Sequence, residues 1–262
     1  MRPVDDLIRK YYSDVPMGER VLADLVQEVI SQKRFPILDA GCGRKAKYLR
    51  RFGPEAQLVG IDLSPQLPKD LPVVRGDLVS LPFRDNSFYF VFSRSVFEHL
   101  PKPDEVLNEF HRVLKPGGRC AIVTPNRYDY SSLVAWVTPQ TFHEYFIRNL
   151  YRLGAYDSFP VFYRANTPRY FEKLALEKRK WTIVRISGLR HYPANLSFSR
   201  ILFRIGILYD KLLAKMNCVS LQPSLLVVLE KATPLSEETA ADEHVLDDKG
   251  ISQSASVWTQ KT

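Results

Sequence analysis

The sequence predicts an α/β protein in which helices cover both faces of a largely parallel β-sheet. Short, continuously apolar segments alternate with segments of helical spacing, and this order is typical of a parallel sheet buried on both sides. Three of the apolar segments end close to an aspartate, namely Asp39, Asp62 and Asp77. Ligands of such sheets bind at the carboxyl ends of the strands, so the three carboxylates indicate one binding edge.

The first half of the chain supplies strands and helices in turn, in a helical leader at 1–35 and a core at 36–126. Short apolar runs mark the strands, and apolar positions at helical spacing mark the helices. Strands are expected at 36–40, 56–62, 72–77, 86–95 and 119–125. Helices are expected at 18–33, 44–52 and 103–114. The prolines between residues 64 and 72 leave no room for a long helix after the second strand.

After Thr124 the alternation is lost, and three further parts follow. Residues 127–166 are rich in aromatic side chains with weak periodicity, and we expect a mainly helical cap inserted over the sheet edge. Residues 167–231 return to the core, with helices expected at 168–179 and 199–216 and strands at 181–187 and 219–231. Residues 232–262 are polar and aperiodic, which predicts a disordered acidic tail.

The charge of the chain is unevenly distributed. The net charge of the 262 residues is +8, but residues 127–215 carry 15 Lys and Arg against 6 Asp and Glu, a net of +9. Residues 232–262 carry 2 Lys against 6 acidic residues, a net of −4. The basic segment suits an acidic small molecule, an anionic lipid or a nucleic acid, and equally a solvated surface.

The cysteines argue against two classes of protein. Cys42, Cys120 and Cys218 lie far apart without a CxxC pair, so neither a zinc site nor a disulfide framework is expected, and no metal is assigned. Cysteines that lie far apart and form no such pair are typical of a protein in a reducing cytosol. The sequence lacks the apolar core of a signal peptide and any run of about 20 apolar residues that would span a bilayer. We therefore expect a cytoplasmic protein.

The stretch "ILDAGCGRKAKYL", residues 37–49, combines a strand end, a glycine turn and a helix start. Glycines at Gly41 and Gly43 allow a ligand close to the backbone, and the free N–H groups of the next helix attract anions. Two cofactors fit this pattern. A dinucleotide would use Asp62 for its ribose, whereas S-adenosylmethionine is usually signalled by an aspartate before the glycines, here Asp39.

Two downstream segments, "GDLVSLPFRDNSFYFVFSRSVFEHL" (76–100) and "NEFHRVLKPGGRCAIVTPNR" (108–127), favour the second cofactor. Together with the glycine turn they resemble class I S-adenosylmethionine-dependent methyltransferases, of the large small-molecule group similar to methyltransferase type 11. The resemblance covers residues 36–127. It implies a Rossmann-like, doubly wound, seven-stranded sheet whose last strand is antiparallel, with S-adenosylmethionine as the cofactor.

The resemblance also implies a role for residues at each strand end. Asp39 would accept hydrogen bonds from the cofactor's ammonium group, Asp62 from its ribose hydroxyls and Asp77 from its adenine amino group. Ser93 and Arg94 would lie near the sulfonium. The full set of expected cofactor-binding residues is Asp39, Gly41, Cys42, Gly43, Asp62, Leu63, Asp77, Leu78, Ser93 and Arg94.

Residues outside the cofactor set are candidates for the acceptor. Tyr12 is placed to close over the site, or to pack the leader on the core. Tyr163, Arg164 and Arg169 combine hydrogen-bond donors with a helix start, which suits an acidic group of the substrate and equally a solvated helix cap. His143, in the expected cap, is the candidate base if the methyl group goes to an oxygen.

The helix expected at 199–216 is apolar on nearly every side. Packing against the core or cap is the first interpretation. Peripheral contact with a membrane, with basic side chains reaching the headgroups, and contact with a second copy are the alternatives. The sequence does not decide the oligomeric state.

The function that these residues indicate is methyl transfer to the oxygen or carbon of a small-molecule or lipid-like acceptor. An RNA-modifying methyltransferase is one alternative, although no RNA-binding module is visible, so nucleic acid is not the expected partner. A non-catalytic binding or scaffold protein of the same fold is the other. Lys45 and Tyr89 depart from the family pattern and favour that alternative, whereas the three aspartates argue against it.

Overall fold

The computed structural model describes most of the chain up to Ala232. The described residues are 3–15, 17–53, 56–129, 160–178, 180–216 and 218–232. Most of the expected cap, residues 130–159, lies outside them, as do the expected tail at 233–262 and the candidate base His143.

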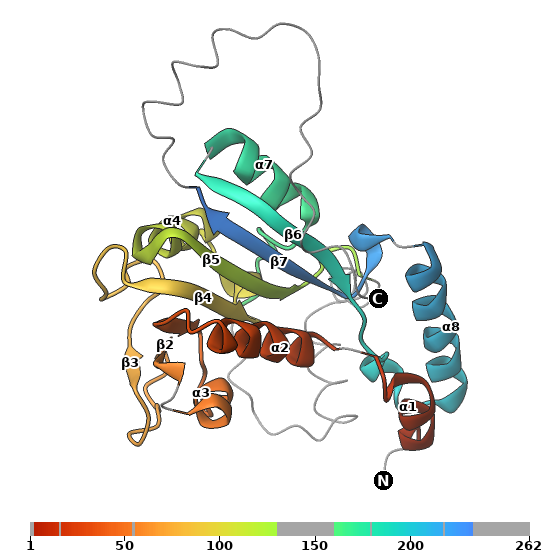
Figure 1. The fold of residues 1–262 in the computed structure, drawn as a ribbon. Helices are drawn as coiled ribbons and strands as arrows, with labels where there is room; N and C mark the ends of the chain where they lie inside the picture. Colours follow the sequence, from red (N-terminus) through yellow and green to blue (C-terminus); the bar gives the residue numbers. More distant parts are fainter. Residues whose placement is uncertain are drawn as a thin grey trace, which may run out of the picture. The chain divides into compact units, whose positions relative to one another are not determined.

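Seven strands form one sheet in the order β3-β2-β1-β4-β5-β7-β6 (Figure 1). The strands are β1 (Ile37–Ala40), β2 (Leu58–Asp62), β3 (Val73–Arg75), β4 (Phe88–Arg94), β5 (Leu114–Pro125), β6 (Trp181–Leu189) and β7 (Ser224–Lys231). The first five strands are parallel, and β7 is antiparallel to both of its neighbours. The expected doubly wound sheet with an antiparallel last strand is confirmed.

The strand order reverses at β1. From β1 the chain first builds outward through β2 and β3, then returns to β4 on the other side of β1. Asp39 is accordingly paired with Gly60 of β2 and with Phe92 of β4. Such a reversal opens a crevice at the carboxyl ends of the strands, which is where open α/β sheets bind ligands.

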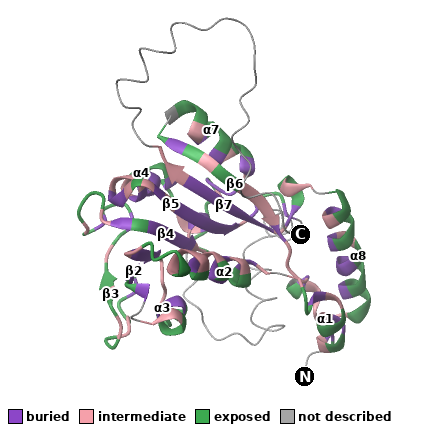
Figure 2. Ribbon diagram, viewed as in Figure 1, coloured by how far each residue is buried: buried purple, intermediate pink, exposed green. Residues whose placement is uncertain are grey.

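Helices cover both faces of the sheet (Figure 1). The helices are α1 (Asp5–Tyr12), α2 (Gly18–Ser31), α3 (Lys47–Phe52), α4 (Pro103–Val113), α7 (Pro168–Lys178) and α8 (Arg200–Met216), with short 3-10 turns at Phe97–His99, Ala194–Leu196 and Val219–Leu221. Phe110 of α4 and Phe171 of α7 lie in the core of one face, and Leu22 of α2 and Leu49 of α3 in that of the other. The strands between them are largely buried (Figure 2).

Helix and strand boundaries follow local chemistry. Helix α3 begins at Lys47, later than the expected residue 44, because Ala46 adopts a left-handed conformation with φ 40°. Helix α7 begins as expected, with the Thr167 hydroxyl accepting a hydrogen bond from the N–H of Tyr170. Strand β5 begins at Leu114 rather than 119, because Leu114 already pairs with Phe88 across an irregularity in β4.

Helix α1 was not expected as a separate helix, and it packs on α8. Val4, Leu7 and Tyr12 share a small core with Phe203 and Ile207 of α8. The Arg200 guanidinium donates to both carboxylate oxygens of Asp6, at 2.8 Å each. Within the described part of the chain, no helix has the length and apolarity to cross a bilayer.

Candidate functional site

The glycine turn after β1 is fixed by its backbone. The N–H groups of Gly41 and Cys42 both donate to the carbonyl oxygen of Ile61, at 2.8 and 3.1 Å. Gly41 has φ 86°, and a Cβ there would lie 2.3 Å from a Val96 methyl carbon. Gly43 has φ 67°, but a Cβ there would meet nothing within 4 Å. The turn is thus tight on the Gly41 side and open on the Gly43 side.

Asp62, at the end of β2, holds this turn in place. One carboxylate oxygen accepts a hydrogen bond from the Gly43 N–H at 2.8 Å, and the other from the Ser64 N–H at 2.8 Å. A carboxylate offers about four lone-pair positions, so each oxygen keeps a position for a further donor. The Asp62 carboxylate can therefore organise the turn and bind two ligand hydroxyl groups together.

Asp39, at the end of β1, is a buried carboxylate with an unsatisfied oxygen. Its residue is only 3% exposed, and the Oδ2 atom has no hydrogen-bond partner among the described residues. Burial and the nearby Asp62 charge raise the pKa of Asp39 to about 8, although Arg94 opposes them. An unpaired buried carboxylate is costly unless a donor or cation meets it. The chemistry of this position fits an ammonium group.

The pKa of Asp39 predicts opposite effects of Asp39→Asn on stability and on ligand binding. Because the folded state holds the proton more tightly than an unfolded aspartate of pKa about 4, the free protein loses stability as the pH rises from about 4 to about 8. The amide introduced by the substitution does not titrate, so the variant should melt above the wild-type protein at alkaline pH. A bound ammonium group favours the ionised Asp39, so cofactor affinity should fall in the same variant.

Thermal melts of the ligand-free proteins across the range from about pH 4 to above about pH 8, with calorimetric titration of S-adenosylmethionine, measure the two effects. Identical pH dependence of the melting temperatures in wild type and variant would contradict the assigned titration. Unchanged cofactor affinity would contradict the contact with the ammonium group.

Ser93 and Arg94, the two residues expected near the sulfonium, lie at the carboxyl end of β4. The Ser93 hydroxyl is fully buried and has no hydrogen-bond partner among the described residues. The Arg94 guanidinium lies 3.6 Å from the Glu19 carboxylate of α2. Its charge also reaches Asp39, lowering the pKa of that carboxyl. Arg94 therefore balances the acidic side chains at this edge.

The expected adenine end of the site has a different character. Asp77 is exposed, and its carboxylate accepts a hydrogen bond from the Val79 N–H at 3.1 Å. Leu78 is buried in the core, whereas Leu63, directly after Asp62, is largely exposed. Exposed apolar and polar groups beside two strand ends suit a flat aromatic ring with a polar edge.

Comparison with known proteins assigns this arrangement. The family model described as a methyltransferase domain matches residues 38–122. Residues 38–122 are therefore similar to a methyltransferase domain. The match covers β1 to most of β5, including Asp39, Asp62 and Arg94, and it confirms the resemblance to class I, S-adenosylmethionine-dependent methyltransferases.

Relatives of known name match over the same part of the chain. The demethylmenaquinone methyltransferase of Listeria welshimeri is 30% identical over 130 residues, which are 44% of this chain and 53% of that protein. The malonyl-[acyl-carrier protein] O-methyltransferase of Herminiimonas arsenicoxydans is 35% identical over 113 residues, 40% of this chain and 43% of that protein. The chain therefore spans about half the length of these curated relatives or less.

A solved structure shares the fold of the methyltransferase domain and its surroundings. Loganic acid methyltransferase, solved with SAH, aligns with 81% of this chain and 92% of its own, at a TM-score of 0.53 and 14% identity. At this identity the likeness shows the fold alone.

One wall beside the candidate site is built by a polar network that the sequence did not indicate, although Asn166 lies in the donor-rich segment expected to bind the substrate. Thr124, near the end of β5, donates its hydroxyl to the buried Glu98 carboxylate at 3.3 Å, and accepts from the Asn166 amide at 2.6 Å. The carbonyl oxygen of Glu98 accepts from the N–H groups of Phe162 and Tyr163. This buried polar network fastens the segment that ends the expected cap to the carboxyl edge of the sheet.

The expected substrate residues are not gathered at one point in the described structure. Tyr163 lies on the wall just described, with φ 50°, whereas Arg164 is exposed and donates to the Pro101 carbonyl oxygen at 2.8 Å. Arg169 is exposed in the first turn of α7. Tyr12, the last residue of α1, is buried, and its ring packs edge-on against Tyr192 in the segment after β6.

His191 is a second histidine candidate, and no pattern in the sequence indicates it. It follows the carboxyl end of β6, which runs in the same direction as β5, and a Cβ at Gly18 would lie 3.6 Å from its Nε2 atom. Burial lowers the pKa of His191, Arg94 lowers it further, and Asp129 and Asp210 oppose this. The ring is therefore mainly neutral at pH 7 and able to accept a proton.

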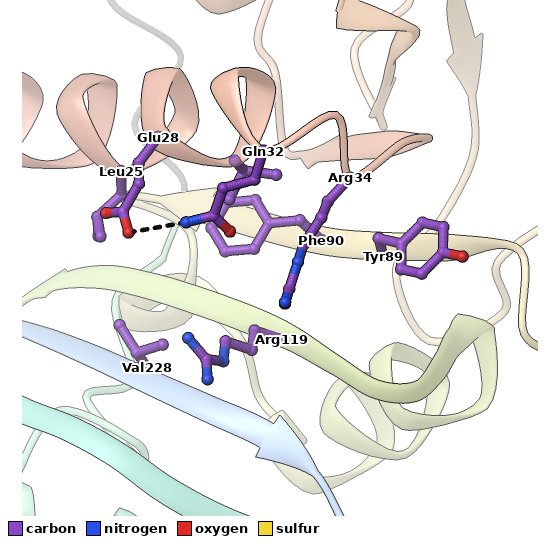
Figure 3. A pocket seen from close by; sticks show the side chains of 9 residues that line it. Leu25, Glu28, Gln32, Arg34, Tyr89, Phe90, Arg119 and Val228 are labelled. Atoms are coloured by element: carbon purple, nitrogen blue, oxygen red, sulfur yellow. Dashed lines mark hydrogen bonds between the residues drawn. The ribbon is translucent and has the colours of Figure 1, made fainter. Parts of the chain in front are cut away.

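A small pocket lies away from this edge, between the end of α2 and the amino-terminal part of β4 (Figure 3). Gln32, Arg34, Tyr89 and Arg119 are among its lining residues. Its volume of about 50 Å³ holds a few water molecules and no cofactor. Tyr89, which departs from the family pattern, therefore lies at the opposite end of β4 from the carboxylates of the site.

Proposed function

We propose that the chain is an S-adenosylmethionine-dependent methyltransferase that acts on the oxygen or carbon of a lipid-like small molecule. The observation that carries the cofactor is the buried, unsatisfied Asp39 carboxylate beside an open glycine turn. The names of relatives support the acceptor class: they include the demethylmenaquinone methyltransferase and the sterol 24-C-methyltransferase erg-4 of Neurospora crassa, 30% identical over 41% of this chain.

The described residues fit each part of the cofactor. Asp39 would hold the ammonium group, and the first turn of the helix after the glycines would hold the carboxylate. Asp62 would accept the ribose hydroxyls with the lone pairs that the backbone leaves free. Leu63 and Asp77 would take the two sides of the adenine ring. The bound cofactor supplies an activated methyl group on a sulfonium.

The residues of the chain would then position the acceptor and manage its proton. Arg94 keeps a positive charge beside the buried Asp39. His191 lies close enough to Arg94 for the Arg94 charge to help keep its ring neutral, at the edge where the acceptor would enter. If the acceptor is an oxygen, His191 is the base that the described residues offer, in the role first assigned to His143. For a carbon acceptor, positioning alone supplies much of the rate.

The test is methyl transfer from S-adenosylmethionine carrying a deuterated methyl group, followed by mass spectrometry of the products. A reduced demethylated quinone with a prenyl tail and the same quinol without its tail form a matched pair of acceptors, and a sterol is a third. We expect the tailed quinol or the sterol to be methylated. The kcat/KM for the tailed quinol should be about tenfold or more above that for the tail-free quinol, because apolar contacts with the tail discriminate on this scale.

Two results would contradict the proposal at different levels. Tight binding of S-adenosylmethionine with no methylation of any lipid-like acceptor would overturn the acceptor class and leave the cofactor assignment standing. No binding of S-adenosylmethionine or its demethylated product would overturn the methyltransferase assignment itself and favour a scaffold role.

A further inference from the structure

Helix α8 has an outward-facing apolar stripe opposite the face that packs on α1. Ile201 is 72% exposed and Leu208 68% exposed, in a helix whose Phe203, Ile207 and Leu213 are buried. The exposed apolar residues of the stripe are Ile201, Ile205, Leu208, Leu212 and Met216. Their spacing of three and four residues places them on one side of the helix. Figure 2 shows exposed and buried residues side by side along α8.

Basic residues flank this stripe, and acidic residues do not. Arg204, Lys211 and Lys215 are exposed, and their positions in the helical repeat put them together along one border of the stripe. The single acidic residue of α8, Asp210, is 4% exposed and bonded to Arg190 at 2.6 Å on the packed side. The outward face is therefore apolar and positively charged, with no carboxylate of its own helix to oppose an anion.

We propose that this face of α8 docks on an anionic lipid surface. An amphipathic helix with an apolar stripe and lysines or arginines along its border lies in the interface of a bilayer, with the apolar side chains among the acyl chains and the basic groups at the headgroups. The apolar residues bury their side chains among the acyl chains, and the basic border adds electrostatic attraction to anionic headgroups.

The helix is held in the right orientation before it meets the surface. Its inner face is covered by α1 through Val4, Leu7 and Tyr12, and the Arg200–Asp6 ion pair joins the starts of the two helices. A helix that is already folded and supported loses little conformational freedom when it binds. This distinguishes α8 from a segment that would have to fold on the membrane.

The packed side of α8, opposite the docking face, is joined to the candidate site. Arg190, directly after β6 and next to His191, donates to both carboxylate oxygens of Asp210 in α8, at 2.6 to 3.3 Å. Docking through α8 would bring the carboxyl edge of the sheet near the bilayer, where a lipid-like acceptor resides. That advantage rests on the proposed function, but the docking itself rests on α8 alone and is measured without catalysis.

A second copy of the chain fits this face less well than a lipid surface does. In a symmetric antiparallel pair of α8 helices, the two basic borders would lie on the same side of the contact. Like charges brought together in this way cost free energy, whereas anionic headgroups neutralise them.

The test is flotation of the 262-residue chain with vesicles of phosphatidylcholine alone and with vesicles of phosphatidylcholine and phosphatidylglycerol in equal parts. We expect binding to the mixed vesicles that weakens with salt, and little binding to phosphatidylcholine alone. Leu208→Glu should raise the Kd for mixed vesicles by about tenfold or more, since it loses one apolar side chain and adds a repelled charge. Leu176→Glu, at a 78% exposed leucine of α7, is the matched control and should bind as the wild type does.

Three outcomes would overturn the proposal. The first is failure of the wild-type protein to bind the mixed vesicles. The second is an equal loss of binding in the α7 control. The third is a wild-type dimer that Leu208→Glu converts to a monomer while vesicle binding stays unchanged, which would assign the stripe to a second copy. Both substitutions are at exposed positions, and thermal melts confirm that the variants are folded.

Discussion

Asp62→Ala should abolish measurable binding of S-adenosylmethionine while the protein stays folded. The substitution removes the acceptor of two backbone hydrogen bonds, from Gly43 and Ser64, and the expected acceptor of two ribose hydroxyls. Hydrogen bonds to a charged group contribute about 1.5 to 3 kcal/mol each, so losing the two ribose contacts alone should raise the Kd by a factor of about 100 or more.

The free energy of unfolding should change much less than the free energy of cofactor binding, because two effects of the substitution oppose one another. The released N–H groups of the turn are partly exposed and can bind water, which limits the loss. The Asp62 charge also raises the pKa of the buried Asp39, so its removal makes ionised Asp39 less costly. In a domain of this size, each kcal/mol of lost stability lowers the melting temperature by roughly 2 to 4 °C. We therefore expect the melting temperature of the ligand-free variant to lie within a few degrees of the wild type.

Calorimetric titration with S-adenosylmethionine and with S-adenosylhomocysteine measures the affinity of both ligands. Asp85→Ala is the matched control: its carboxylate also accepts a hydrogen bond at 2.8 Å, from Arg112, before the amino end of β4 and away from the site. Binding by the control and not by Asp62→Ala would support the site. A tenfold or smaller change in Asp62→Ala would remove Asp62 from the cofactor contacts.

Residues at strand ends could be predicted from the sequence because their positions depend on local pattern. Asp39 and Asp62 each follow a short apolar run, and the carboxyl ends of parallel strands meet at one edge, so their proximity needed no tertiary information. The glycine turn was equally local, since its two glycines have positive φ values that the sequence pattern anticipates.

His191 and the Glu98–Thr124–Asn166 network could not be predicted in this way. His191 reaches the edge only because β7 inserts between β5 and β6 and leaves β6 parallel to β5. Thr124 is 26 positions from Glu98 and 42 positions from Asn166, so no local sequence pattern links the three residues. Long-range topology brings these groups together, and a single sequence carries no signal for it.

For helix α8, the sequence predicts the helix but not which of its sides is buried. Apolar residues surround the expected helix at 199–216, and packing against the core or cap was therefore the first interpretation. In the structure Phe203 and Ile207 pack instead in a small separate core with α1, and Ile201 and Leu208 stay exposed. A helix that is apolar on all sides has no internal sign of which side the protein covers, because the choice depends on where α1 lies.

Gly41→Ala should be strongly destabilising and should also weaken cofactor binding. The backbone at φ 86° disfavours any side chain, at about 1 to 2 kcal/mol. The added Cβ would lie 2.3 Å from a methyl carbon of Val96, a short and stiff side chain that cannot swing away. Overpacking of this kind adds about 1 to 3 kcal/mol. A loss of about 3 kcal/mol corresponds to a fall of roughly 6 to 12 °C in melting temperature.

Gly43→Ala is the matched comparison, because it shares the positive φ but not the clash. A Cβ at Gly43 would meet nothing within 4 Å, so only the backbone term of about 1 kcal/mol remains. The open side of the turn is where the cofactor would approach, so this variant should stay stable and yet bind S-adenosylmethionine weakly. Comparing the two variants therefore distinguishes the glycine needed for packing, Gly41, from the glycine needed for ligand binding, Gly43.

A double substitution decides whether the Val96 contact is the cause. Shortening Val96 to alanine in the Gly41→Ala background removes the clashing methyl, so the double variant should be more stable than the sum of the single effects. We expect a coupling of about 1 kcal/mol or more in a double-mutant cycle, within the range of about 0.5 to 3 kcal/mol for residues in contact. Additive effects would mean that the backbone conformation alone requires glycine. In that case Gly41→Ala and Gly43→Ala would have similar melting temperatures, and the turn would be a symmetric feature of the backbone rather than one packed side and one open side.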